Sequence, residues 1–199
     1  MQVSIGATVF DLQRRPLVIA VLERPGRGPA GLERGCLMGM AKEAAGLGAD
    51  LVICPAAAVT EGLPGALADI GVGCVGVATD PVEAEALVRR NVVAILWQGP
   101  GDRVDRGPVG SHSIPTFSRT GESLLPGDGV VVEPDELTEL DRTPPGVVGI
   151  VDLSAIVGRA EIAALVAVAL EAGASGFITS SPSAVRRAAH VIRAVEHAE

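Results

Sequence analysis

The feature that most constrains the fold is a series of short apolar runs rich in β-branched residues, separated by segments with helical periodicity. Strands that are apolar on both faces are typical of parallel sheets covered by helices on each side. Alternation with helices indicates βα units, which leaves a (β/α) barrel or a doubly wound open sheet. The expected strands after the first one are residues 17–22, 51–55, 74–78, 92–97, 130–132, 147–153 and 176–179.

Helix signals separate most of these strands. Asp80, Pro81 and Glu83 provide an N-cap, a proline at N1 and a carboxylate at N3, as at a helix start. Residues 99–127 contain many Gly, Pro, Ser and Arg residues and no amphipathic helix, and a loop of that length is functional or disordered. The expected helices are residues 31–47, 65–70, 81–91, 161–172 and a last one that begins at Pro182.

Missing motifs favour the barrel over the open sheet, and the length limits its size. No G-x-G-x-x-G follows the first strand and no G-x-x-x-x-G-K-[ST] occurs, so a Rossmann or P-loop protein loses support. A complete barrel takes about 200 residues at minimum and typically about 250, whereas this chain has 199. We therefore predict one domain, residues 1–199, folded as a reduced TIM-type α/β barrel that lacks one or two helices.

Composition and charge exclude several classes of protein. The net charge is −8 and Lys42 is the single lysine, which argues against a nucleic-acid partner. No apolar stretch approaches the roughly 20 residues of a membrane span, which argues against a membrane protein. The first residues lack the basic and apolar regions of a secretory signal, so we expect a cytoplasmic location. The cysteines are odd in number, lack C-x-x-C spacing and sit in apolar segments, so we expect buried free thiols at Cys36, Cys54 and Cys74 rather than metal ligands or a disulfide.

Two ends of the chain resemble a known family. Residues 3–22 read V-S-I-G-A-T-V-F-D-L-Q-R-R-P-L-V-I-A-V-L. They resemble the opening of bacterial dihydropteroate synthases, where a hairpin ending in F-D-L-x-x-R-P-L-V leads into the first barrel strand. Residues 44–52 and 161–195 are similar to that family's second strand and closing βα unit. The resemblance implies a pterin-binding TIM barrel, closed at the bottom by an N-terminal hairpin, that joins a pterin pyrophosphate to p-aminobenzoate in folate synthesis.

The family's binding motifs are not retained in the first half of the chain. E-R-P-G-R, at residues 23–27, replaces the N-V-T-P-D-S-F motif of the first strand. I-C-P-A-A-A-V, at residues 53–59, replaces D-V-G-G-E-S-T after the second. Of the S-x-D-T motif only Thr79 persists, and Leu96-Trp97 stands where a pterin-recognising N-D is expected.

The second half departs from the family as well. Residues 133–137 replace D-P-G-x-G-F-x-K, Ser154 replaces the lysine of S-R-K, and residues 178–181 replace R-x-H-D. A buried polar group without a partner costs about 1 to 3 kcal/mol, so several such losses reduce pterin affinity by orders of magnitude. Pyrophosphate also loses the cations that would stabilise its developing charge.

Charged residues at the expected strand ends are candidates for new chemistry, because barrel active sites lie at that end. Glu133 and Asp152 end neighbouring strands and would form a carboxylate pair or a divalent-metal site; the alternative is two exposed strand ends. Glu23 is either a general base or ligand contact, or a surface group. The arginines that would hold an anionic substrate are Arg24, Arg27 and Arg119.

Uncharged candidates also follow the strands. Thr79 is either a ligand contact or, with Asp80, part of a strand end and helix cap. Trp97 and Gln98 fall at the expected barrel mouth, where Trp97 would stack on a flat ligand or cover an open barrel end. Ser111 and His112 could join Asp152 in a triad, but the sequence has no G-x-S-x-G elbow, so we discount that triad.

These observations predict a homologue that has kept the scaffold and lost the chemistry: a binding or partner protein related to folate metabolism, without cofactor or metal. Missing helices around strands four to six would uncover apolar barrel wall, which a homo-oligomer or an active homologue would cover. The alternative is an enzyme with divergent chemistry on a small anionic or pterin-like substrate at the mouth. A third possibility is residual dihydropteroate synthase activity.

Overall fold

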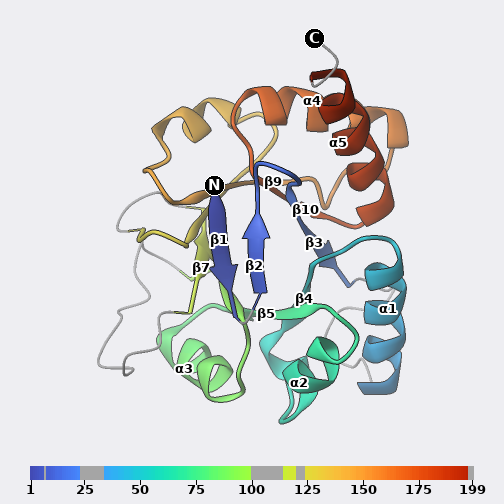
Figure 1. Ribbon diagram of the computed structural model, residues 1–199. Coiled ribbons are helices and arrows are strands. Elements are labelled where there is room, and N and C mark those ends of the chain that lie inside the picture. The colour runs from blue at the N-terminus through green and yellow to red at the C-terminus, as the bar shows by residue number, and fades with distance from the viewer. Residues whose placement is uncertain (7, 23–33, 100–113, 120–123, 197–199) are drawn as a thin grey trace.

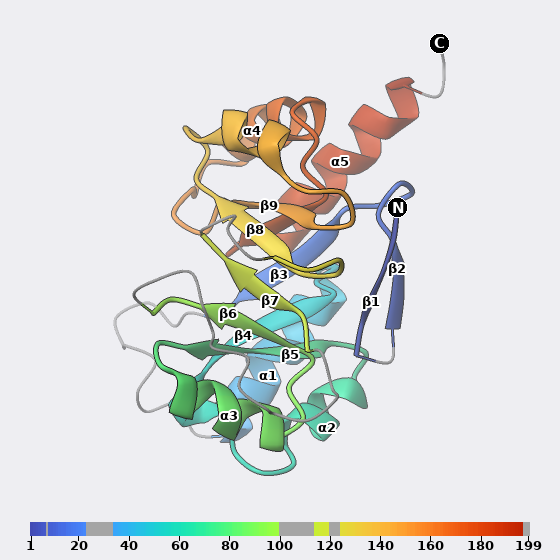
Figure 2. The ribbon, with the colours of Figure 1, turned by 90° about the vertical axis from the view of Figure 1, so that its left-hand side faces the viewer.

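The computed structural model describes residues 1–6, 8–22, 34–99, 114–119 and 124–196. Within them, parallel strands form a closed barrel in the order β10-β3-β4-β5-β6-β7-β8-β9 (Figures 1 and 2). The predicted TIM-type barrel is confirmed. Its strands are β3 (Leu17–Val21), β4 (Leu51–Pro55), β5 (Gly73–Ala78), β6 (Ala94–Trp97), β7 (Thr116–Ser118), β8 (Gly129–Val132), β9 (Val148–Asp152) and β10 (Gly176–Thr179).

Helices cover two sides of this barrel (Figure 1). The described residues between β7 and β8 contain no helix, and β8 is followed by the 3-10 helix η2 (Leu137–Arg142), so the helix ring is reduced as predicted. No described helix has both the length and the apolar character needed to cross a membrane. Besides η2, the described helices are α1 (Arg34–Gly46), η1 (Ala56–Ala58), α2 (Leu63–Ala68), α3 (Pro81–Arg89), α4 (Arg159–Glu171) and α5 (Pro182–Glu196).

An N-terminal hairpin closes the bottom of the barrel. Strands β1 (Gln2–Ile5) and β2 (Thr8–Asp11) pair antiparallel around a turn that contains Gly6, at φ +60°. Figure 2 shows the hairpin across the end at which the barrel strands begin. Val3 and Phe10 pack with the residues inside the barrel, so the hairpin face that they share is part of the core.

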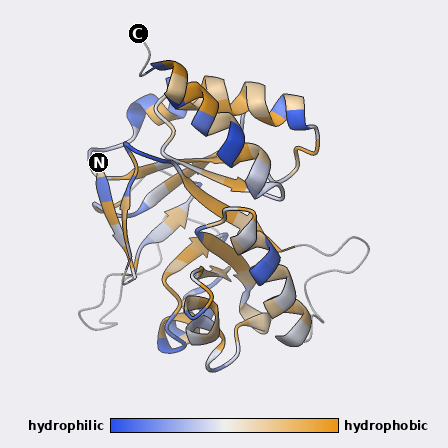
Figure 3. Ribbon diagram, turned by 45° about the vertical axis from the view of Figure 1, so that its right-hand side comes forward, coloured by the Kyte–Doolittle hydropathy of each residue, from blue (hydrophilic) through white to orange (hydrophobic). Residues whose placement is uncertain are grey.

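Side chains alternate between the inside and the outside of the barrel, because successive residues of a strand point to opposite faces. Leu17, Ile19 and Ile150 belong to the cluster inside the barrel. Val18 and Val151, one position along, belong to an outer cluster that includes residues of α4 and α5. Figure 3 shows the strands as largely apolar and the more hydrophilic residues on the helices and turns.

Strand β7 corrects the interpretation of residues 99–127 as one long loop. Thr116–Ser118 lies within that segment and pairs with both β6 and β8. Phe117 is fully buried among the residues inside the barrel. A three-residue strand with one large apolar side chain gives too short a pattern to recognise in a sequence. This strand nevertheless completes the barrel.

Candidate functional site

Three charged side chains meet at the mouth, the end at which the barrel strands finish. Phe117 of β7 lies inside the barrel, and Arg119 follows it by two positions, so both side chains point to the same face. The same relation holds for Glu133 after Val131. It also places Asp152 two positions after Ile150, which again lies inside the barrel.

Arg119 forms ion pairs with both carboxylates. Its Nη2 contacts a carboxylate oxygen of Glu133 and lies 3.6 Å from Oδ2 of Asp152. The Asp152 side chain is 17% exposed and its Oδ1 accepts a hydrogen bond from the backbone N–H of Ser154 at 2.9 Å. The expected proximity of Glu133 and Asp152 is therefore present, with an arginine between the two carboxylates.

Thr79 and Asp80 form the cap of α3 rather than part of this cluster. The Asp80 carboxylate accepts hydrogen bonds from the backbone N–H groups of Val82 at 2.8 Å and Glu83 at 2.9 Å. Glu83 in turn accepts from the Thr79 backbone N–H and hydroxyl, both at 2.8 Å. Reciprocal bonds of this kind satisfy the free N–H groups at a helix start, so the local hydrogen bonds explain both residues.

The side chains of Trp97 and Gln98 point to opposite faces of the barrel wall. Leu96 lies inside the barrel, so Gln98, two positions later and exposed, reaches the mouth. Trp97 is 5% exposed and packs in the outer cluster between the barrel and α1–α3. A Cβ atom on Gly99 would lie 2.5 Å from the Trp97 ring, which shows how closely the chain covers it. The structure thus places Trp97 away from the mouth where the sequence analysis expected it.

The other predicted site residues lie outside the described part of the chain. These are Glu23, Arg24, Arg27, Ser111 and His112.

Polar residues at the end of β10 are bonded within the protein. Thr179 is fully buried, and its Oγ1 accepts a hydrogen bond from the N–H of Ser181 at 2.9 Å. Ser180 donates to the carbonyl of Ser154 at 3.3 Å. These residues align with the family's R-x-H-D motif, and here they supply no cation at the mouth.

Cys54 and Cys74 are buried thiols, as predicted, whereas Cys36 is half-buried. Cys54 and Cys74 are buried on the outer face of β4 and β5. A hydrogen bond with Cys54 raises the pKa of the Cys74 thiol far above its ordinary range, and burial raises it further. Across the described residues, no three His, Cys, Asp or Glu side chains are grouped so that they could hold a metal ion.

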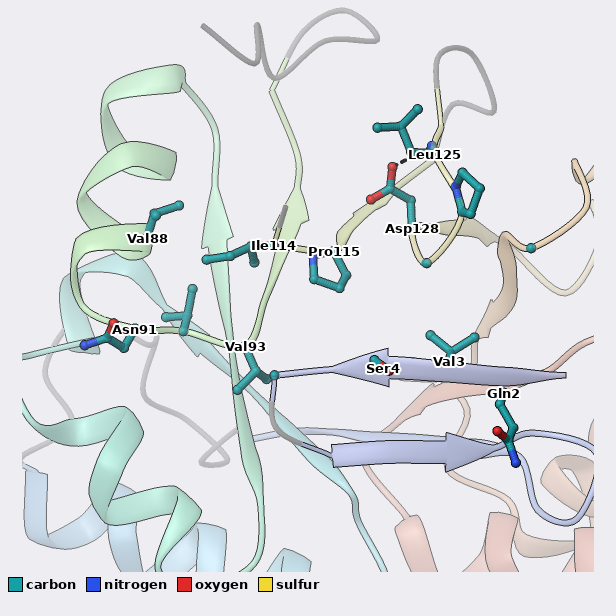
Figure 4. A pocket seen from close by; sticks show the side chains of 15 residues that line it. Gln2, Val3, Ser4, Val88, Asn91, Val93, Ile114, Pro115, Leu125 and Asp128 are labelled. Atoms are coloured by element: carbon teal, nitrogen blue, oxygen red, sulfur yellow. Dashed lines mark hydrogen bonds between the residues drawn. The ribbon is translucent and has the colours of Figure 1, made fainter. Parts of the chain in front are cut away.

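Sequence reasoning did not find a recess at the opposite end of the barrel. A cleft of about 940 Å³ lies between the hairpin and the starts of β6, β7 and β8 (Figure 4). The helix-poor composition of residues 99–127 predicted uncovered wall at strands four to six of the barrel. That prediction is wrong for the described strands, because their outward side chains Ile95, Trp97, Val130 and Val132 are buried. The cleft lies instead at the starts of those strands.

Solved structures resemble the whole chain at low sequence identity. Yersinia pestis dihydropteroate synthase, with a pterine-sulfa conjugate, gives a TM-score of 0.71 and 12% identity over 100% of both chains. For the Xanthomonas albilineans enzyme with 4-aminobenzoic acid, the TM-score is 0.71 and the identity 13%, over 100% of this chain and 99% of that chain. For a dihydropteroate synthetase with a product, the TM-score is 0.74 and the identity 14%, over 100% of this chain and 99% of that chain.

The sequence itself matches no family model and no curated protein in the comparisons made. At these identities the solved structures establish architecture and not activity. The chain therefore has the fold of the dihydropteroate synthases, in a divergent form with a reduced ring of helices.

Proposed function

We propose that this protein is a non-catalytic homologue of dihydropteroate synthase that acts by binding, as a partner protein related to folate metabolism. The observation that carries the proposal is the ion-pair cluster of Arg119, Glu133 and Asp152. In it, Arg119 pairs with two carboxylates of the same chain, so one positive charge faces two negative charges.

Such a mouth is poorly suited to the synthase reaction. Departure of pyrophosphate requires cations aimed at the developing negative charge. Here Arg119 faces two carboxylates, which repel an anion that approaches it. At the other strand ends, Ala78 and Trp97 pack in the outer cluster and Pro55 is apolar, so the amide of Gln98 at the end of β6 faces the mouth where the family has an N-D pair.

Ligand-dependent thermal stability tests this proposal. A ligand that binds the folded protein raises its melting temperature by mass action. We expect no increase with pterins, p-aminobenzoate or pyrophosphate at millimolar concentration, and an increase with pterin plus pyrophosphate would contradict the proposal. Dihydropteroate synthase from Yersinia pestis is a suitable positive control, because its structure with a pterine-sulfa conjugate is known.

The same cluster also supports a second candidate, an enzyme with divergent chemistry on a small anionic or pterin-like substrate. Its carboxylates and arginine face the mouth, the position of active sites in TIM barrels. A panel of small phosphates and divalent metals would then raise the melting temperature, and Glu133→Gln would abolish that increase. Glu85→Gln is the matched control, since Glu85 pairs with Arg89 on α3, away from the Arg119 cluster.

The kind of partner follows from the reduced ring of helices. A second copy or an active homologue of the synthase would pack beside strands β6–β8, where the described helices leave the ring incomplete. Light scattering on the purified chain, alone and mixed with an active synthase, distinguishes the two partners. A monomeric protein that does not bind the synthase would contradict both proposed partners.

A further inference from the structure

The cleft at the bottom of the barrel has an apolar lining and a strand along one side. Val93, Ile114 and Pro115, from the starts of β6 and β7, form one part of the lining (Figure 4). Leu125, 49% exposed, lies at another part of it. Gln2 and Ser4 of β1 line the opposite side. The cleft is thus far from Arg119 and is built from different parts of each strand.

The free edge of β1 faces this cleft. Among the described residues β1 pairs with β2 alone. The backbone N–H of Leu12 donates to the carbonyl of Met1 at 2.9 Å, and hydrogen-bonded pairs alternate along an antiparallel ladder. Val3 therefore bonds toward β2, and the backbone N–H and C=O groups of Gln2 and Ser4 point the other way, toward the cleft.

The side chains of β1 do not protect that edge. Natural edge strands are shielded by short length, charged side chains, proline or bulges. The segment Gln2–Ile5 reads Q-V-S-I, without a charge or a proline, and its length of four residues limits an added strand to a short segment. An unpaired edge beside an apolar recess offers alternating donors and acceptors together with a surface for side chains, which is the arrangement used in strand addition.

We propose that this cleft binds an extended peptide segment of a partner protein, which adds to the hairpin as a strand along β1. The segment bonds to the backbone of Gln2 and Ser4 and places apolar side chains, at alternate positions, against Val93, Ile114 and Pro115. Among the described residues of the lining the charged one is Asp128, and the whole chain carries a net charge of −8, so a neutral or basic segment is favoured over an acidic one. This inference rests on the proposed function as a binding protein and names the chemistry of its partner.

A second copy of this chain fits the cleft less well. Its own Val3 and Ile5 are buried against its barrel, so its β1 has no apolar side chain to offer. Its β1 edge also lies in the same recess, and two recessed edges cannot reach each other. A single extended segment meets neither obstacle.

Ser4→Pro is the decisive variant. Proline removes the N–H that faces the cleft, and it is tolerated at edge positions whose N–H is not bonded to the neighbouring strand. Ser4→Thr retains the N–H and is the matched control. Random decapeptides displayed on phage are selected against the full-length chain, and the enriched peptides are then synthesised and titrated by fluorescence polarisation.

We expect enriched peptides with apolar residues at alternate positions. Ser4→Pro should weaken their binding by about tenfold or more, since lost backbone hydrogen bonds and a blocked approach combine. Ser4→Thr should stay within about twofold of the parent chain. Hydrogen exchange at the amides of Gln2 and Ser4 should slow when peptide is bound.

Several results would overturn the inference: no enrichment, equal binding to Ser4→Pro, or protection at the barrel mouth instead of β1. A dimer of the parent chain that Ser4→Pro converts to monomer would assign the cleft to a second copy and overturn it too. Peptides methylated on alternate backbone nitrogens should bind weakly to the parent chain. This test does not use the Ser4→Pro variant, so it remains valid if that variant does not fold. All these measurements are independent of pterin binding, so their failure is distinguishable from failure of the proposed function.

Discussion

Arg186 of α5 forms a buried ion pair with Asp50, the residue that precedes β4. It also donates to the backbone carbonyls of Pro16 at 2.6 Å and Gly48 at 2.8 Å. Burial lowers the pKa of the Arg186 guanidinium from its ordinary value, while the Asp50 charge opposes that change. The pair joins the last helix to the starts of β3 and β4, next to the place where the last barrel strand, β10, pairs with the first, β3.

Removing this arginine should destabilise the fold strongly. Arg186→Met leaves the Asp50 carboxylate, 5% exposed, with the ion pair to Arg15 at 2.6 Å and the N–H of Val18 at 2.9 Å. Breaking a buried pair costs about 3 to 5 kcal/mol when no partner remains, so we expect about 2 to 3 kcal/mol here. Urea denaturation measures the free energy of unfolding. Arg89→Met is the control: Arg89 pairs with Glu85 at the surface, is 74% exposed, and should cost less than about 1 kcal/mol. Equal effects of both variants would contradict the role of the buried pair.

The cap of α3 makes a smaller and more local contribution. Asp80→Ala removes the acceptor for two backbone N–H groups and should lower the free energy of unfolding by about 1 kcal/mol. Asp80→Asn, which keeps an acceptor oxygen, should recover most of that loss in the same urea measurement. If Asp80→Ala leaves stability unchanged, Asp80 does not act as a cap, and Thr79 becomes a candidate ligand contact again.

The buried thiols should make the protein sensitive to alkaline pH. Above the ordinary thiol value of 9.0 the unfolded chain releases its Cys74 proton, whereas the folded chain retains it, because its pKa is raised. The unfolded state then binds fewer protons, so stability falls as pH rises, by at most about 1.4 kcal/mol per pH unit for this thiol.

Denaturation between pH 8 and pH 10.5 measures this slope. Cys74→Ala should flatten it, after allowance for its own loss of stability at pH 8. Thiol reagents give a second readout, because the thiolate is the reactive form. Cys54 and Cys74 should react with them only after unfolding, and rapid reaction of either cysteine in the folded protein would contradict this account.

Much of the barrel could be predicted because its strands are continuous apolar runs. The expected strand at 176–179 coincides with β10, and the expected helix start at Asp80 is the observed cap. The short strand β7 was not recognisable, since only Phe117 in Thr116–Ser118 is a large apolar residue. Its recognition depends on neighbours β6 and β8, which are distant in sequence.

The candidate site could be predicted in part for a related reason. Glu133 and Asp152 end recognisable strands, so parallel pairing brings them to one mouth. The position of Arg119 between them depends on β7, and its role as counter-ion was therefore not foreseen. The direction of Trp97 depends on strand register, since a shift by one residue exchanges the two faces of a strand. The sequence alone did not define that register.

The most direct test of the central claim is an assay for dihydropteroate formation. Purified full-length protein is incubated with p-aminobenzoate and a pterin pyrophosphate, and product is quantified by chromatography beside an active synthase. The ion-paired mouth of Arg119, Glu133 and Asp152 predicts no product above the protein-free blank. Turnover comparable to that of the active synthase would contradict the account.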